Sequence, residues 1–435
     1  MKRVAPSDSP KANALPEALE VWLDDALVGD IVHLGRIHRS GDSVRFEYSK
    51  AWLAHPLAFK LDPELALDGG SFHPKDSNFG VFLDSCPDRW GQTLMKRREL
   101  VQAKNEKRVR RVLTPWDFFL GVQDVTRMGA LRFSPLQANV NLKTGPQPVF
   151  TGEECLANEA LAAPALTQLS ELQGVAFKLS GKSSDDLSLL EQWLKVLVAP
   201  GASLGGARPK ANVRDGQGRL WISKFPSSED EHDWALREML LHELAEDFGV
   251  QTSPARVERI GNGYHTFVTL RFDRQDGRRR FFTSAMALLG KSDSEGASYL
   301  DMADFLSKLG VEAHLDADLR QMFRRVLFNV AVANRDDHLR NHGFIWHKEG
   351  WRPAPAFDMN PSTKKEEHIL AIDDADPSPD LDLVMSTADW YRVSAADAQA
   401  DLTRLRTTLG SWERRARKLG LSAEDRQELT GVIQA

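Results

Sequence analysis

The chain has 435 residues, of which 42% are hydrophobic and 27% are charged, and its formal net charge is -6 at pH 7. This length predicts two or three compact units. The composition excludes a largely disordered chain. The negative net charge excludes a general attraction to nucleic acid or to anionic membranes, so such a partner could bind only at one local face of the protein.

The cysteines and the N-terminal segment indicate the compartment. The two cysteines, Cys86 and Cys155, show no metal-ligand spacing, so neither a disulfide framework nor a zinc site is expected. Residues 1–15 contain Pro, Ser and Asn instead of an apolar core, and no run of about 18 apolar residues occurs. We therefore expect no export signal, no membrane span and a cytoplasmic location.

The first part of the chain reads as strands followed by a basic segment. From about Leu19 to Tyr48, the runs LEVWLD and VRFEY alternate and are broken by Gly and Asp, which predicts half-buried strands. The stretch from Met95 to Arg111 is strongly basic. Such a run is most often a solvated helix face, and a site for nucleic acid or an acidic partner is the alternative. Residues 135–148 are polar and punctuated by Pro and Gly, which is typical of a domain boundary.

A second unit begins near Val149 and combines a loop, a strand and a helix. A helical run over residues 184–198 is followed by the Gly-rich loop GASLGGARPKA and by LWISKF, a predicted strand that ends near Lys224. Residues 231–248 have a helical apolar stripe, and Glu238 lies on it. A carboxylate on a buried stripe predicts a cationic partner, for which Lys224 is the natural candidate.

The remaining chain is mainly helical, and its polar loops follow one long helix. Strand-like runs occur at about residues 255–260 and 266–272. Residues 316–333 have the apolar spacing of a buried helix. The polar cluster NRDDHLRN follows at once, then a predicted hairpin over residues 343–356 and the loop APAFDMNPS. The order of elements predicts an α+β fold that is strand-rich first and helix-rich afterwards.

The polar loops have the spacing that phosphoryl transfer requires. This chemistry needs a carboxylate to accept the proton of the attacking hydroxyl, and oxygen ligands that hold magnesium against the nucleotide phosphates. In the protein-kinase pattern an Asp and an Asn are five residues apart, and a second Asp follows a hairpin. Asp336, Asn341 and Asp358 reproduce this order. The histidine is placed differently, at His338.

The phosphates also require a cation and backbone donors. Lys224 at a strand end, paired with Glu238, is similar to the lysine and glutamate of kinases, and Gly205 and Gly206 would let backbone N–H groups approach phosphate. Taken singly, each feature has an ordinary reading as a turn, a helix cap or a surface lysine. Their common order over about 160 residues favours the functional interpretation.

At these residues the chain resembles the HipA family, the kinase toxins of bacterial type II toxin-antitoxin modules. The resemblance covers nearly the whole chain. The N-terminal motifs are VWLDDALVGDI, DSCPDRWG (residues 84–91) and RMGALRF (residues 127–133), and the later ones are GGARPK, ISKFP, RFDR (residues 271–274), NRDDHLRN and AFDMN.

The resemblance implies a two-lobed serine/threonine protein kinase fold. It would comprise an N-terminal β-rich subdomain (residues 17–147), a kinase N-lobe (148–272) and an all-helical C-lobe (273–435). It implies ATP and Mg²⁺ as cofactors, Asp336 as catalytic base, and Asn341 and Asp358 as metal ligands. The implied ATP contacts are Gly205, Gly206, Ala207, Arg208, Pro209, Lys210, Lys224, Leu270, Arg271, Phe272, His338, Phe357, Asp358, Met359 and Asn360. Ser203 falls where family members autophosphorylate a serine, which ejects the Gly-rich loop and silences the kinase.

The same resemblance implies the partners. Family members phosphorylate an aminoacyl-tRNA synthetase, commonly the glutamyl enzyme, and are neutralised by a HipB-like helix-turn-helix antitoxin that binds operator DNA. We expect this chain to reach operator DNA through such an antitoxin. Leu270 replaces an acidic hinge residue of the best-known member, and the DNA-contacting basic residues of that member have no match here. Two alternatives share the sequence features: a kinase of a small molecule or lipid, and a catalytically idle co-repressor module.

Overall fold

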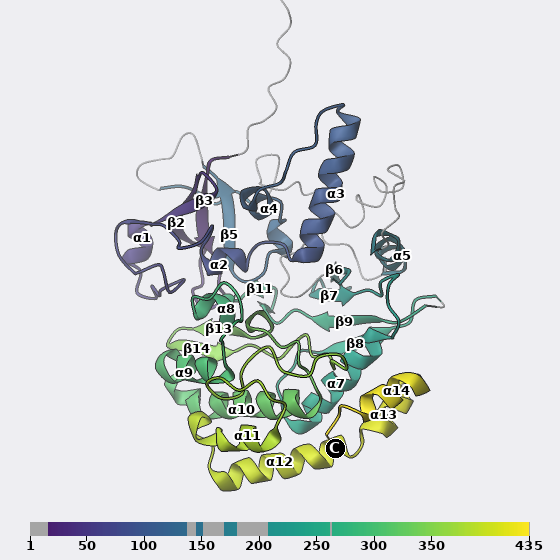
Figure 1. The fold of residues 1–435 in the computed structure, drawn as a ribbon. Helices are drawn as coiled ribbons and strands as arrows, with labels where there is room; N and C mark the ends of the chain where they lie inside the picture. The colour runs from purple at the N-terminus through teal and green to yellow at the C-terminus, as the bar shows by residue number, and fades with distance from the viewer. Residues whose placement is uncertain (1–15, 137–144, 151–168, 181–207, 262, 435) are drawn as a thin grey trace, which may run out of the picture.

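The computed structural model describes residues 16–136, 145–150, 169–180, 208–261 and 263–434. The N-terminal region contains an antiparallel five-stranded sheet of order β4-β3-β2-β1-β5. Its strands are β1 (Ala18–Leu23), β2 (Val32–Ser40), β3 (Ser43–Tyr48), β4 (Ser71–Phe72) and β5 (Leu131–Pro135). The helices of this region are α1 (Lys50–Leu53), α2 (Gly80–Leu83), α3 (Arg89–Asn105) and α4 (Pro115–Leu120), with a short 3-10 helix, η1 (Asp124–Thr126). Figure 1 shows this region at the top of the molecule.

The strands occur where the sequence predicts them, but β1 is not half-buried. All six of its residues are buried, because β2 and β5 pair with its two edges and packing covers both of its faces. The buried carboxylate of Glu20 is satisfied by His33 Nε2 at 2.7 Å and by Arg36 Nε at 2.9 Å. A guanidinium and an imidazole partner thus allow a carboxylate inside a buried strand.

The middle of the molecule is a second antiparallel sheet, of order β6-β7-β9-β8, with one long helix. Its elements are β6 (Lys210–Arg214), β7 (Leu220–Lys224), α7 (Trp234–Phe248), β8 (Ala255–Glu258) and β9 (Thr266–Leu270), and α5 (Leu169–Ser180) precedes them. Helix α7 begins where Asp233 caps the N–H of Leu236 and ends at Gly249, whose φ of 97° suits a glycine. The predicted helix over residues 184–198 lies outside the described residues.

The last part of the chain is mainly helical but is not all-helical. Its helices are α8 (Ala285–Leu288), α9 (Tyr299–Leu309), α10 (Leu315–Ala331), α11 (Leu381–Ser386), α12 (Ala395–Leu409), α13 (Trp412–Leu419) and α14 (Ala423–Thr430), with the 3-10 helices η4 (Glu312–His314), η5 (Leu339–Asn341) and η6 (Ala388–Tyr391). It also contains the hairpin of β10 (Arg274–Gln275) and β11 (Arg278–Arg279) and the sheet β12-β13-β14, formed by Phe282–Ser284, Gly343–His347 and Gly350–Pro353. The hairpin β13-β14 is the one predicted between the two polar loops. None of the described helices combines the length and the apolar character needed to cross a membrane.

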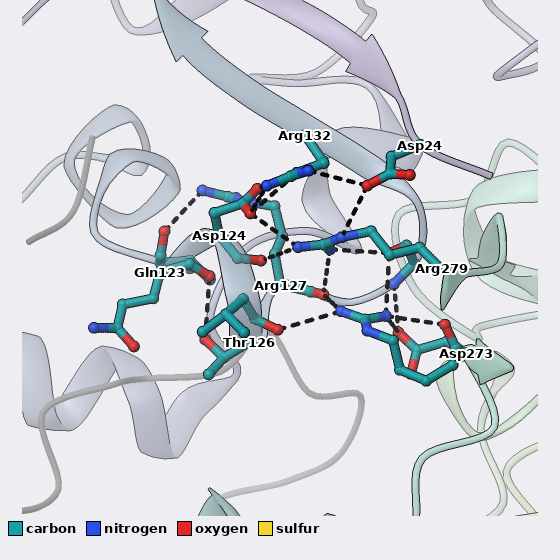
Figure 2. A network of polar contacts seen from close by, with 12 residues as sticks. Asp24, Gln123, Asp124, Thr126, Arg127, Arg132, Asp273 and Arg279 are labelled. Carbon is teal, nitrogen blue, oxygen red and sulfur yellow. Dashed lines mark hydrogen bonds and ion pairs between the residues drawn. The ribbon is translucent and has the colours of Figure 1, made fainter. Parts of the chain in front are cut away.

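Three segments of the N-terminal region contact the two lobes directly. The Asp84 carboxylate accepts hydrogen bonds from the Ser284 backbone N–H at 2.6 Å and from the Ser284 hydroxyl at 2.7 Å. The Trp90 indole donates to the carbonyl of Lys210 at 3.1 Å. The buried guanidinium of Arg271 donates to the carbonyl of Thr126 at 2.7 Å. Figure 2 shows Thr126 beside a network of arginines and aspartates that includes Arg127, Arg279 and Asp273. The sequence motifs around residues 84–91, 127–133 and 271–274 therefore lie at the junctions between the parts of the fold.

Candidate functional site

The centre of the site is an ion-paired triad that joins the two lobes. Lys224 ends strand β7, and its Nζ lies 2.6 Å from Oε1 of Glu238 on α7. The same Nζ lies 2.5 Å from Oδ1 of Asp358, which follows β14. The pair of Lys224 with Glu238 is the one expected from the sequence, whereas the contact with Asp358 was not predicted.

One lysine charge faces two carboxylates, and their pKa values respond differently. Burial opposes ionisation of Asp358, but the charges of Lys224 and Lys210 prevail and lower its pKa to about 2. The pKa of Glu238 is raised, because burial and the charge of Asp358 outweigh the attraction of Lys224. Asp358 is therefore the firmly ionised member of the triad, which is the state that a metal ligand needs.

The backbone at Asp358 adopts the left-handed conformation, with φ of 58°. This conformation is uncommon for a residue with a side chain and persists only where the surroundings enforce it. Two residues later, the backbone N–H of Asn360 donates to Oδ1 of Asn334 at 3.1 Å, and Asn334 precedes Asp336 in the other polar loop. This hydrogen bond ties the two polar loops together.

The loop after α10 presents Asp336 outward and Asn341 inward. The Asp336 side chain is 64% exposed and pairs with Lys365. Asn341 is buried; its Nδ2 donates a long bond of 3.4 Å to the carbonyl of Asp336, and its Oδ1 has no hydrogen-bond partner among the described residues. A buried acceptor without a donor is costly, so this oxygen is suited to a ligand that the protein itself does not provide.

The buried carboxylate of Asp337 anchors the same loop to the core. It accepts a hydrogen bond from the Tyr299 hydroxyl at 2.6 Å and from the Asn329 amide at 2.7 Å, and lies 2.6 Å from Nε2 of His342. Burial would raise the pKa of Asp337, but His342 and Tyr299 lower it. All four side chains are buried. The network anchors the segment that carries Asp336 and Asn341.

A cavity lies between the lobes beside the triad. Its lining includes predicted nucleotide contacts from both lobes: Lys210, Lys224, Leu270, Arg271, Phe272, Phe357, Asp358 and Met359. Its volume of about 50 Å³ holds water molecules but is too small for a nucleotide. The rings of Phe272 and Phe357, 5.5 Å apart, lie close together at this site. A nucleotide could enter this cavity only if side chains or lobes moved apart.

Several of the expected ATP contacts already have their polar groups engaged by other parts of the protein. Lys210 Nζ pairs with Asp88 of the N-terminal region at 2.9 Å. The guanidinium of Arg271 is committed to Thr126, Asn212 and Asp273. Arg208 pairs with Asp230. The carbonyl of Pro209 accepts a hydrogen bond from the backbone N–H of Phe225 at 2.8 Å. His338 lies near Asp358 and contributes to the lowering of its pKa. Ser203, Gly205, Gly206 and Ala207 lie outside the described residues.

Two side chains of the polar loops, Asp358 and Asn341, offer oxygen donors of the type that magnesium takes. Mg²⁺ is usually held by one or two carboxylates together with substrate phosphates and water, rather than by a full protein cage. Among the described residues no group of three or more His, Cys, Asp or Glu could hold a metal ion. The ionised Asp358 and the unpartnered Asn341 Oδ1 are oxygen ligands of the kind that Mg²⁺ prefers.

Three residues at the site were not found from the sequence. Lys365 contacts Asp336 from a loop that gives no periodic signal. Asp88 was noted only within a motif. Asp337 stands beside Asp336, and two adjacent carboxylates at the end of a buried helix could have indicated that one of them turns inward.

Comparison with known proteins gives concordant results. Residues 202–430 match the family model described as the HipA-like C-terminal domain, and residues 19–113 match the HipA N-terminal domain. A protein of Sinorhizobium fredii (strain NBRC 101917 / NGR234), named as the kinase Y4mE, is 25% identical over 402 residues, which are 88% of this chain and 83% of that protein.

The fold is also similar to a solved structure. HipA of Shewanella oneidensis MR-1, determined in complex with HipB and its operator DNA, superimposes with a TM-score of 0.59 at 17% identity and covers 95% of this chain and 94% of that one. This likeness supports the two-lobed, protein-kinase-like α+β fold. Because the C-terminal model alone spans more than half of the residues and the N-terminal model matches the preceding region, the chain belongs to the HipA family.

Proposed function

We propose that the chain is an ATP- and magnesium-dependent serine/threonine protein kinase and acts as the toxin of a HipBA-like module. The observation that carries this proposal is the triad in which Lys224 bridges Glu238 on α7 and Asp358 beyond the hairpin. A buried lysine held by a helix carboxylate and facing an ionised loop carboxylate is the arrangement that positions nucleotide phosphates and their metal in kinases.

Each residue has a distinct role in this proposal. Asn341 and Asp358 would hold Mg²⁺, which neutralises charge on the phosphates when bound. Lys224 would orient the phosphates, and Glu238 would keep Lys224 in place after Asp358 turns to the metal. Asp336, exposed at the edge of the site, would accept the proton of the attacking serine or threonine hydroxyl.

The partners are proposed from the family. The Shewanella oneidensis protein is complexed with HipB and operator DNA, so we propose a HipB-like antitoxin for this chain, with operator DNA reached through the antitoxin. We further propose that the chain acts in the cytoplasm, inhibits translation by phosphorylating an aminoacyl-tRNA synthetase such as the glutamyl enzyme, and inactivates itself by autophosphorylation at Ser203.

The test is transfer of labelled phosphate. Purified protein is incubated with γ-labelled ATP and Mg²⁺, alone and with a cell lysate, and labelled serine and threonine residues are located by mass spectrometry. We expect label on Ser203 and on a synthetase, loss of label with EDTA, and at least a hundredfold slower transfer in Asp336→Asn. Asp374→Asn, which changes another exposed aspartate, is the matched control.

The outcomes separate the alternatives. Phosphotransfer that survives Asp336→Asn would remove that residue from its role. ATP turnover that requires a small-molecule or lipid acceptor would indicate a metabolite kinase. Absence of both ATP binding and phosphotransfer in the wild type would indicate a catalytically idle co-repressor.

A further inference from the structure

A second and much larger cavity lies behind the cleft, between the N-terminal region and the kinase lobes. It has a volume of about 950 Å³ and is lined by β5 and η1 on one side and by the turns β6-β7 and β10-β11 on the other. This volume is within the range of about 300–1,000 Å³ that small-molecule sites occupy. Lys224, Asp336 and Asp358 are not among its lining residues, so it is separate from the proposed catalytic site.

The lining is strongly cationic. Eight arginines but only three aspartates line the cavity, and the lining contains no lysine, histidine or glutamate. Asp273 lies just behind the wall and neutralises part of the excess through Arg271 and Arg274. The remaining charge is positive, although the whole chain has a net charge of -6. A concave, low-dielectric wall of one sign concentrates anions.

The arginines fall into two groups, and the first is structural. Figure 2 shows three of them, the buried Arg127 and Arg279 and the half-buried Arg132. Arg127 and Arg279 donate to backbone carbonyls, and Arg132 and Arg279 also pair with Asp124. Burial opposes ionisation of Asp124, but these arginines outweigh it and lower its pKa. This group holds the parts of the fold together and has little donor capacity left for a ligand.

The second group is placed at the rim. Neither Arg214, at the end of β6, nor Arg278, on β11, has a carboxylate within 4.0 Å among the described residues. Arg214 donates one long bond of 3.5 Å to the carbonyl of Gly218, and Arg278 donates to the carbonyl of Gly29. A guanidinium has five N–H donors in a fork that matches phosphate oxygens, so the part of the chain that the structure describes leaves most of this capacity unused.

Apolar surface completes the wall. The ring of Phe150 lies 3.5 Å beneath the guanidinium of Arg132, and Leu220 and Leu270 contribute aliphatic surface. Such a wall suits a ligand with an organic body as well as charged groups. Duplex nucleic acid presents an extended convex backbone, which a concave cavity of this size does not accommodate.

We propose that this cavity binds a small organic polyphosphate. Arg214 and Arg278 would hold its phosphate groups, and Phe150 and Leu220 would contact its organic part. Leu270 and Arg271 line both this cavity and the one between the lobes. The proposed ligand would therefore sit directly behind the hinge that supports the nucleotide.

The test uses inorganic tripolyphosphate as the probe, titrated calorimetrically into the full-length protein. The cleft is first saturated with magnesium and a non-hydrolysable ATP analogue, so that heat reports the second cavity. We expect the double variant Arg214→Ala/Arg278→Ala to bind the probe at least tenfold more weakly than the wild type. The control Arg414→Ala/Arg417→Ala removes two exposed arginines from α13 and should bind within twofold of the wild type.

Each result decides the proposal. Unchanged binding in the rim variant, or an equal loss in the control, would overturn it, because the attraction would then be general. Binding of a DNA duplex that depends on the rim arginines, without binding of tripolyphosphate, would overturn it in favour of a nucleic-acid site. Circular dichroism of both variants verifies folding, and the single variant Arg278→Gln, at an exposed position, repeats the test if the double variant unfolds.

Discussion

Replacing Asp337 by alanine should lower the free energy of unfolding by about 3–5 kcal/mol, the usual cost of removing one partner from a buried charged network. The carboxylate serves Tyr299, Asn329 and His342, each within 2.7 Å. Three buried groups left without an acceptor would cost about 1–3 kcal/mol each if nothing relaxed. Asn329 Nδ2 also lies 3.3 Å from the Tyr299 hydroxyl, so these two groups can partly satisfy each other. The loss of unfolding free energy should therefore be nearer about 3 than about 5 kcal/mol.

The assay is urea unfolding followed by tryptophan fluorescence and far-ultraviolet circular dichroism. Tyr299→Phe removes one donor and leaves the carboxylate with its other partners, so it should cost about 1 kcal/mol. Asp374→Ala removes an exposed aspartate and should change stability by at most about 0.5 kcal/mol. A loss in Asp337→Ala no larger than that in Asp374→Ala would refute the view that this network anchors the loop that carries Asp336 and Asn341.

Two further predictions concern other buried charges. Burial, reinforced by Arg335 and opposed by Asp337, lowers the pKa of His368 from 6.5 to about 4. Because the pKa is lower in the folded state, the unfolded chain takes up the proton first, so the free energy of unfolding should fall by up to about 3 kcal/mol as pH drops from 6.5 to 4. Urea midpoints measured between pH 7 and 5 should depend less steeply on pH in His368→Leu than in the wild type. An unchanged pH dependence would contradict this prediction. Lys224→Met should cost about 3–5 kcal/mol by leaving both Glu238 and the ionised Asp358 without their cation, and Glu238→Leu added to it should restore the part due to Glu238; a double variant less stable than Lys224→Met would count against the pair of Lys224 with Glu238.

The sequence predicts elements and pairs whose cause is local. Helix α10 follows from its apolar spacing, and the pair of Lys224 with Glu238 follows because a carboxylate on a buried stripe needs a cation. The roles assigned to Asp336, Asn341 and Asp358 remain predictions. The contact of Lys224 with Asp358 could not be predicted, because the two residues are 134 positions apart and only the approach of the lobes brings them together. For the same reason, alternation suggested a half-buried β1, although packing from distant segments covers both of its faces.

The contacts of the N-terminal region indicate that it is part of the site's support and not a separate appendage. Asp88 holds the Nζ of Lys210 at 2.9 Å, and the charge of Lys210 helps to keep Asp358 ionised. The carbonyl of Thr126 accepts from Arg271, which adjoins the predicted hinge. A displacement of the N-terminal region would therefore change both the charge beside Asp358 and the position of the hinge. Since a buried charge that loses its partner is strongly destabilising, this region can influence the cleft without lining it.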